Sequence, residues 1–220
     1  NWTDNHIKET LGDLLNLNKE NVDNKYIRAL MFQLFESNGV IKRDDVNEIV
    51  KSVKTEERKK IWELGIKIGR YHIYLPKMLK PKAVALRITL WRLFYQLSAS
   101  QDIPKSGLNH LIDKKYNKNL LLLCGFEKFK KHYVRIDILD KLFIKILNKT
   151  EKRKFKIDSD MMNLLGCSKE DFYSLMLSMN YKKSREIDTY FYAGENKKNK
   201  FTDFKRSENP FKKLLTLNLK

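Results

Sequence analysis

Basic residues with aromatic neighbours are the feature of this sequence best suited to chemistry with a ligand. They form three groups, which lie within residues 70–87, 128–135 and 182–185. Lys and Arg neutralise phosphates and release counterions, while Tyr and His can stack on unpaired bases. We therefore predict contact with nucleic acid, against the alternative that each group is an ordinary charged surface facing water. The candidate residues are Arg70, His72, Lys77, Lys80, Lys82, Arg87, Lys128, Lys130, Lys131, Tyr133, Arg135, Lys182, Lys183 and Arg185.

Catalytic motifs are absent from the sequence. It contains no GxxxxGKS, GxxxxGKT or GxGxxG segment and no acidic DExH box, so we expect no motif here to cradle the phosphates of ATP and any ATP hydrolysis to occur outside this chain. No histidine lies at metal-ligand spacing from a cysteine or carboxylate, which predicts no metal site. We expect His72 to hydrogen-bond or stack at the surface of a strand. Acidic pairs such as Asp44 and Asp45 fall at expected helix starts, where capping explains them. The sequence thus predicts no catalytic residue and no cofactor in this segment.

The net charge indicates which class of partner to expect. The formal charge is +18, from 45 Lys and Arg against 27 Asp and Glu. Residues 1–57 carry 8 basic and 11 acidic residues, so the positive excess lies in residues 58–220. An excess of this size favours a nucleic-acid partner first and an anionic membrane surface second. The alternative is that abundant Lys, together with Asn and Ile, reflects an AT-rich coding sequence.

Cysteine usage and hydropathy bear on localisation. Cys124 and Cys167 have no CxxC spacing, which predicts buried, reduced thiols. The sequence has no signal peptide, and no apolar run approaches the roughly 18 residues of a membrane span. We therefore expect a cytoplasmic protein without a membrane partner. The chain begins with Asn1 and Trp2 instead of Met, so we expect it to be part of a longer protein.

Apolar periodicity predicts an α+β fold that is predominantly helical, with amphipathic helices and short β-hairpins. We place a helical subdomain at residues 1–100, an α+β subdomain at 101–195, and a basic, partly mobile tail at 196–220. Within 155–193 the expected order is strand, short helix, longer helix and strand, which is the order of a winged helix. Residues 44–75 show a similar order, so two related modules are one interpretation, and unrelated pairs of amphipathic helices are the other.

Four local predictions rest on pattern alone. Residues 65–75 read as two half-buried strands or one bulged strand. A helix should run from Pro81 to about residue 97, with Arg87, Arg92 and Gln96 facing water. Residues 108–116 are expected to be helical, and residues 120–126 are expected to be extended.

The segment 64–91 also resembles part of a known family. Two weaker matches follow it in the same order, the first in residues 125–126 and 134–142 and the second in residues 161–168. Together they resemble the region beyond the motor domains of an alphaproteobacterial DExH-type superfamily 2 helicase, related to the mitochondrial degradosome RNA helicase. The matching residues of the first segment are Leu64, Gly65, Ile68, Gly69, Arg70, His72, Leu75, Pro76, Leu79, Lys80, Pro81, Ala83, Leu86, Arg87, Leu90 and Trp91.

This resemblance implies a parent protein that unwinds RNA or DNA duplexes by ATP hydrolysis, with ATP and Mg bound by motor domains outside this chain. The region itself would guide a strand or brace the motor domains. The implied partners are nucleic acid, with RNA favoured over DNA, the motor domains of the same parent chain, and an exoribonuclease as a further candidate.

Two interpretations of other classes stay open. One is a free-standing winged-helix DNA-binding protein, for which Ser174, Ser178 and Asn180 are the uncharged polar candidates on the recognition helix. The other is a protein-interaction scaffold, whose basic excess would be compositional. A continuous basic stripe would favour nucleic acid, whereas scattered lysines would favour the scaffold.

Overall fold

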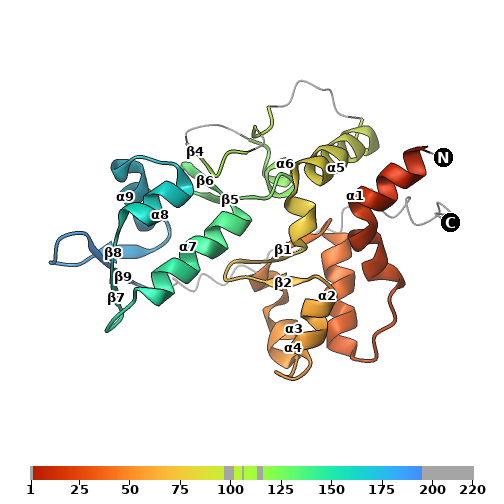
Figure 1. Ribbon diagram of the computed structural model, residues 1–220, viewed down its shortest axis with the longest axis horizontal. Coiled ribbons are helices and arrows are strands. Elements are labelled where there is room, and N and C mark those ends of the chain that lie inside the picture. Colours follow the sequence, from red (N-terminus) through yellow and green to blue (C-terminus); the bar gives the residue numbers. More distant parts are fainter. Residues whose placement is uncertain (1, 97–101, 106, 113–115, 195–220) are drawn as a thin grey trace. The chain divides into compact units, whose positions relative to one another are not determined.

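The chain forms two structural units in a computed structural model that describes residues 2–96, 102–105, 107–112 and 116–194 (Figure 1). The first unit contains the described residues within 1–106 and 116–125, and the second contains those within 107–115 and 126–207. The second unit thus begins near the boundary placed at residue 101, but residues 116–125 belong to the first unit. The predicted tail at 196–220 lies outside the described residues.

The first unit is mainly helical. Its strands are β1 (Val40–Lys42), β2 (Lys67–Ile68) and β3 (His72–Tyr74). Its helices are α1 (Trp2–Lys19), α2 (Lys25–Glu36), α3 (Asn47–Ser52), α4 (Arg58–Glu63), α5 (Pro81–Phe94) and α6 (Lys118–Leu123), with the 3-10 turns η1 (Arg43–Val46) and η2 (Pro76–Leu79).

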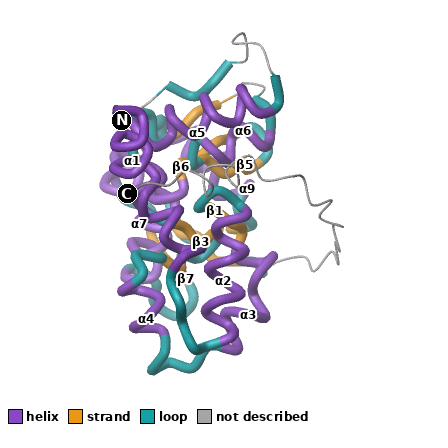
Figure 2. Tube along the Cα trace, turned by 90° about the vertical axis from the view of Figure 1, so that its right-hand side faces the viewer, coloured by secondary structure: helices purple, strands orange, loops and turns teal. Residues whose placement is uncertain are grey.

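A small antiparallel sheet and the helices share one apolar core in this unit. The strand order is β1-β3-β2, and Ile73 pairs with Ile41 on one side and with Ile68 on the other. Residues 65–75 therefore form two strands, the first of the two predicted alternatives. Leu14 of α1 and Leu34 of α2 are fully buried in the core. Helices α2 and α3 pack side by side (Figure 2).

Gly39 allows η2 to approach the end of α2. Its backbone has φ +84°, and a Cβ atom built there would lie only 2.7 Å from Cγ of Met78. Its carbonyl oxygen accepts a hydrogen bond from the backbone N–H of Leu75 (3.0 Å). A residue with a side chain would be strained here both by its backbone and by the contact.

The second unit contains two further antiparallel sheets. Their strand orders are β4-β6-β5 and β7-β9-β8. The strands are β4 (His110–Ile112), β5 (Phe126–Phe129), β6 (His132–Arg135), β7 (Lys154–Lys156), β8 (Tyr181–Lys183) and β9 (Thr189–Tyr192). The helices are α7 (Ile136–Asn148), α8 (Ser159–Leu165) and α9 (Lys169–Ser178). Small sheets within a largely helical chain confirm the predicted α+β class.

Local capping signals fix the elements of residues 158–178. The side chain of Asp158 accepts a hydrogen bond from the backbone N–H of Met161 (2.9 Å) at the start of α8. Gly166 ends that helix in the left-handed region, with φ +67°. Ser168 Oγ then accepts from the backbone N–H of Asp171 (3.1 Å) and begins α9. The predicted order of a short helix followed by a longer one is confirmed.

Within the described residues, one arrangement occurs three times. In every sheet, the last of three successive strands lies in the middle and pairs with the other two. A helix precedes each set of strands (α2, α5 and α7), and one or more helices lie between the first and second strands. We call the hairpin formed by the second and third strands of each set a terminal hairpin; the three are β2–β3, β5–β6 and β8–β9.

Two predictions in the middle of the chain are wrong. Residues 110–112, expected to be helical, form strand β4 because they pair with residues of β6 that lie 20 to 24 positions further along the chain. Residues 120–123, which belong to the segment 120–126 expected to be extended, instead lie in helix α6. The side chain of Asn117 begins this helix by accepting hydrogen bonds from the backbone N–H groups of Asn119 (2.9 Å) and Leu120 (3.4 Å).

Candidate nucleic-acid interface

The β5–β6 hairpin carries the most compact set of predicted contact residues. Phe129 pairs with His132, so Lys130 and Lys131 form the two-residue turn at its tip. Both lysines and Lys128 are exposed. The backbone of Lys130 has φ +52°, a conformation that favours Gly or Asn. The ammonium of Lys128 lies 5.5 Å from the centre of the Tyr133 ring. The tip of this hairpin is therefore cationic, with a strained residue at its apex.

The β8–β9 hairpin also carries exposed cations. Lys182, Lys183 and Arg185 are exposed on it. The acidic residues of the connecting loop are held by partners elsewhere: Glu186 pairs with Lys154 (2.7 Å), and Asp188 pairs with Lys169 (3.1 Å). Neither Lys182 nor Arg185 forms an ion pair with a described residue, so both can take an external anion.

The β2–β3 hairpin and the following turn carry the first predicted group. Arg70 lies in the hairpin turn, with its guanidinium carbon 5.6 Å from the centre of the Tyr71 ring. Lys77 forms an ion pair with Asp13 of α1 (2.9 Å). Lys80 and Lys82 are exposed on either side of Pro81, at the start of α5. The structure thus places these residues on two adjoining segments of the first unit.

Three predicted contact residues have side chains that do not reach the surface. His72 lies in the central strand β3 and is 1% exposed, contrary to the prediction that it lies at the surface of a strand. Tyr133 of β6 is 2% exposed. Arg87 is fully buried, although its helix pattern placed it facing water. The central strand of a small sheet covered by helices is inaccessible on both faces, which the alternating pattern alone did not reveal.

Arg87 instead joins three chain segments of the first unit. Its Nη1 donates a hydrogen bond to the carbonyl oxygen of Asn38 (2.7 Å), and its Nη2 donates to those of Met78 and Leu123, the latter at 2.8 Å. These carbonyls lie at the ends of α2, η2 and α6, where helices leave acceptors unsatisfied. Burial lowers the pKa of Arg87 to about 10. Among the described residues, no acidic side chain forms an ion pair with it, so its role is structural.

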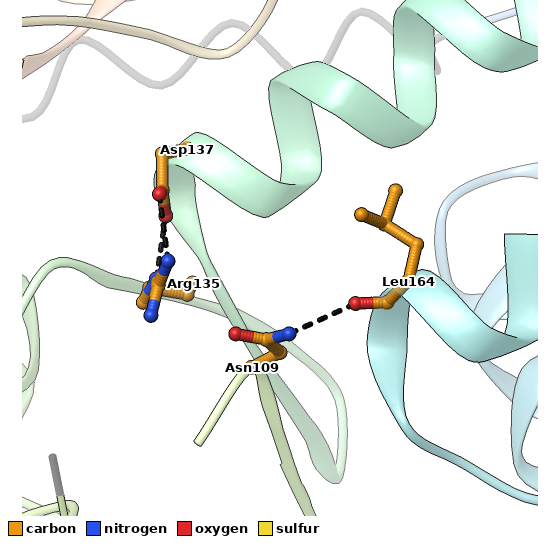
Figure 3. A network of polar contacts seen from close by, with 4 residues as sticks. All are labelled: Asn109, Arg135, Asp137 and Leu164. Carbon is orange, nitrogen blue, oxygen red and sulfur yellow. Dashed lines mark hydrogen bonds and ion pairs between the residues drawn. The ribbon is translucent and has the colours of Figure 1, made fainter. Parts of the chain in front are cut away.

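Arg135 is also committed to a partner within the protein. Figure 3 shows its guanidinium directed at Asp137, to which it donates two hydrogen bonds (2.6 and 2.8 Å). The hydrogen bond with Asp137 raises the pKa of Arg135. In the same view, the side-chain amide of Asn109 donates to the carbonyl oxygen of Leu164 (3.0 Å). Because a carboxylate already neutralises it, Arg135 is a weak candidate for a phosphate contact.

A polar network links a sheet of the second unit to α9. Nε2 of His110 lies 3.0 Å from Nδ1 of His132, and Nε2 of His132 lies 2.9 Å from Oγ of Ser174. His132 is fully buried. Burial and the neighbouring His132 lower the pKa of His110 to about 4, although Asp171 opposes the shift. The network stabilises the neutral imidazole of His110 and fixes Ser174 in the fold.

The two thiols are free and have little thiolate character. Cys124 is buried, whereas Cys167, expected to be buried, is half-buried. Burial raises the pKa of each thiol to about 11. Within the described part of the chain, no three or more His, Cys, Asp or Glu side chains come together where they could hold a metal ion.

One group of accessible residues was missed by sequence reasoning. Helix α4 carries Arg58, Lys59 and the largely exposed Trp62, next to Lys67 of β2. The sequence signal was the position of Trp62. This indole follows Arg58, Lys59 and Lys60 and precedes Lys67, so it lies among four basic residues.

Comparisons of the chain with protein-family models, with curated proteins and with solved structures found no match. None of the described helices is both long and apolar enough to cross a membrane. The functional argument therefore depends on the residues and geometry given above and on the resemblance of residues 64–91 and 125–168.

Proposed function

We propose that this chain is an accessory region of an ATP-dependent helicase that binds nucleic acid, RNA in preference to DNA, and braces the motor domains. One observation supports the binding role above others: all three terminal hairpins carry basic residues selected from the sequence. These are Arg70 on β2–β3, the lysine group on β5–β6, and the group at residues 182–185 on β8–β9. Lys and Arg on projecting hairpins can follow a phosphate backbone.

The helicase part of the proposal is supported by the resemblance of residues 64–91. In the structure, several residues that carry the resemblance are internal: Ala83 and Arg87 are buried in α5, and Leu75 is buried beside the sheet. Because these three side chains are buried, they can support the surface but are not accessible to a ligand. This is consistent with a bracing role, in which the segment holds an outer surface at a fixed position.

A winged-helix-like module in residues 136–192 would fit this proposal. The order α7, β7, α8, α9, β8, β9 and the strand order β7-β9-β8 support it. In such a module, contact through the β8–β9 hairpin is favoured over contact through α9. The first turn of α9 contains Glu170 and Asp171, which would repel phosphate.

A free-standing DNA-binding regulator is less well supported, because α9 offers few groups for reading bases. Ser174 Oγ is hydrogen-bonded to His132, and Ser178 Oγ donates to the carbonyl oxygen of Ser174 (2.8 Å). Both serines therefore have partners within the unit. Asn180 is exposed in the turn that follows the helix.

The test is the affinity of the 220-residue chain for fluorescent single-stranded RNA and for DNA of the same sequence, across a salt series. We expect log affinity to fall linearly with log salt concentration, by about 0.7 per phosphate contact, and RNA to bind more tightly. Absence of binding to either strand at low salt would refute the strand-guiding role and leave a docking or scaffold function.

A further inference from the structure

A pocket of about 750 Å³ lies in the first unit, between α4 and β2. Arg43, Arg58, Lys59 and Lys67 line it together with Trp62, and its other lining side chains are aliphatic. No acidic side chain lines it. Its volume falls within the range of about 300–1,000 Å³ that is common for small-molecule sites.

Trp62 is the unusual member of this lining. Its side chain is 80% exposed, although the preceding Ile61 is 1% exposed and anchors α4 in the core. It makes no ring contact with another described residue. Exposing an indole leaves a large apolar surface in water, and Trp is enriched where a protein binds partners. The fixed helix therefore holds a flat aromatic surface beside the pocket.

The cations around Trp62 differ in how they are held. Nη1 of Arg43 donates a hydrogen bond to the carbonyl oxygen of Gly69 (3.0 Å), and the ammonium of Lys67 lies 5.6 Å from the centre of the Tyr74 ring. These contacts position both cations at the pocket. Arg58 and Lys59 are exposed and form no ion pair with a described residue. The acidic residue of α4, Glu63, pairs with Lys60 (3.8 Å).

We propose that this pocket binds an unpaired nucleotide of a single strand, with its base stacked on Trp62 and the adjacent phosphates held by Arg43, Arg58, Lys59 and Lys67. A flat apolar surface surrounded by cations matches the alternation of base and phosphate in a single strand. The inference rests on the proposed function for the class of ligand, but it uses residues outside the β5–β6 and β8–β9 hairpins. In this inference Trp62 contacts a base, whereas the residues of those two hairpins contact phosphates.

The experiment compares wild type with Trp62→Ala, binding an intact uridine 12-mer and a 12-mer of abasic sugar phosphates. Stacking of one base predicts an affinity for the intact strand about 5- to 150-fold lower in Trp62→Ala. The abasic strand should bind equally to both proteins, because it lacks the stacking group. Trp62→Phe should retain most of the affinity. Phe32→Ala, which removes another exposed aromatic ring of this unit, should change neither affinity.

The outcomes separate this inference from the proposed function. Wild-type affinity in Trp62→Ala, with normal salt dependence, would overturn the pocket assignment and leave the hairpins as the interface. Binding that is sensitive to Trp62 but not to substitution of the hairpin lysines would support the pocket and contradict the hairpin interface. No binding of either strand by wild type would overturn both. Since Trp62 is exposed, thermal unfolding should show that Trp62→Ala folds normally.

Discussion

The guanidinium of Arg87 in α5 donates a hydrogen bond to the carbonyl oxygen of Leu123, the last residue of α6, at 2.8 Å. The two residues are 36 positions apart. The same guanidinium also donates hydrogen bonds to the carbonyl oxygens of Asn38 and Met78. A single side chain therefore satisfies acceptors at the ends of three elements.

Arg87→Met should therefore lower the free energy of unfolding by about 3 kcal/mol, because it leaves two buried carbonyl oxygens and one partly buried carbonyl oxygen without this donor. The measurement is urea denaturation followed by circular dichroism. Lys82→Met, an exposed change in the first turn of the same helix, should alter stability by less than about 0.5 kcal/mol. Equal stability of wild type and Arg87→Met would show that other groups satisfy these carbonyls.

Gly39 and Gly65 provide a matched pair in the same unit. Both have positive φ, +84° and +73°, but only Gly39 lacks room for a side chain, since its Cβ would meet Met78. Gly65→Ala should cost about 1 kcal/mol from backbone strain. Gly39→Ala should cost about 1–3 kcal/mol more, because Met78 must move. Thermal melts of the two variants test this, and similar losses would indicate that the contact relaxes freely.

Lys130 allows stability and binding to be separated. Lys130→Gly should raise the free energy of unfolding by about 1 kcal/mol, because Gly adopts the observed φ of +52° without strain. The same change should weaken single-strand binding about fivefold at 0.1 M salt through the loss of one phosphate contact. Lys131→Gly removes an equal charge at a position without positive φ, so it should weaken binding without stabilising the fold. Unchanged affinity in both variants would exclude the tip as a contact.

The histidine network predicts a dependence of stability on pH. The pKa of His110 is about 4 in the folded protein, compared with 6.5 for a free side chain. Between these values the unfolded chain binds more protons, so stability should fall as pH decreases from about 6.5 to 4. His110→Gln should show a smaller loss over this range in urea titrations at each pH. An identical loss of stability in wild type and His110→Gln would show that the pH dependence comes from carboxylates instead of His110.

How far the sequence predicted this fold depends on whether the signals were local. Residues 154–178 were predicted well because Asp158, Gly166 and Ser168 begin or end helices through contacts within three or four residues. Residues 108–126 were not, since strand β4 requires distant partners in β6 and a run of four leucines fits a helix or a strand.

The candidate site shows the same limit. Its exposed lysines on the β5–β6 hairpin could be selected from charge alone. The burial of Arg87 and the pairing of Arg135 with Asp137 depend on tertiary contacts and on side-chain direction, which composition and spacing do not encode. Trp62 was missed because periodicity describes which side chains face a core, and not which exposed ones lie beside a pocket.

The most direct test of the central claim is the slope of log affinity against log salt for single-stranded RNA. We compare wild type with a variant in which Lys128, Lys130 and Lys131 are all changed to Gln. If all three contact phosphates, the slope should decrease in magnitude by about 2. The control changes Lys8, Lys19 and Lys25 of α1 and α2 to Gln, and it should keep the wild-type slope despite an equal loss of charge. Equal decreases in the two variants would show that the chain attracts RNA through its net charge alone and would contradict an interface at the terminal hairpins.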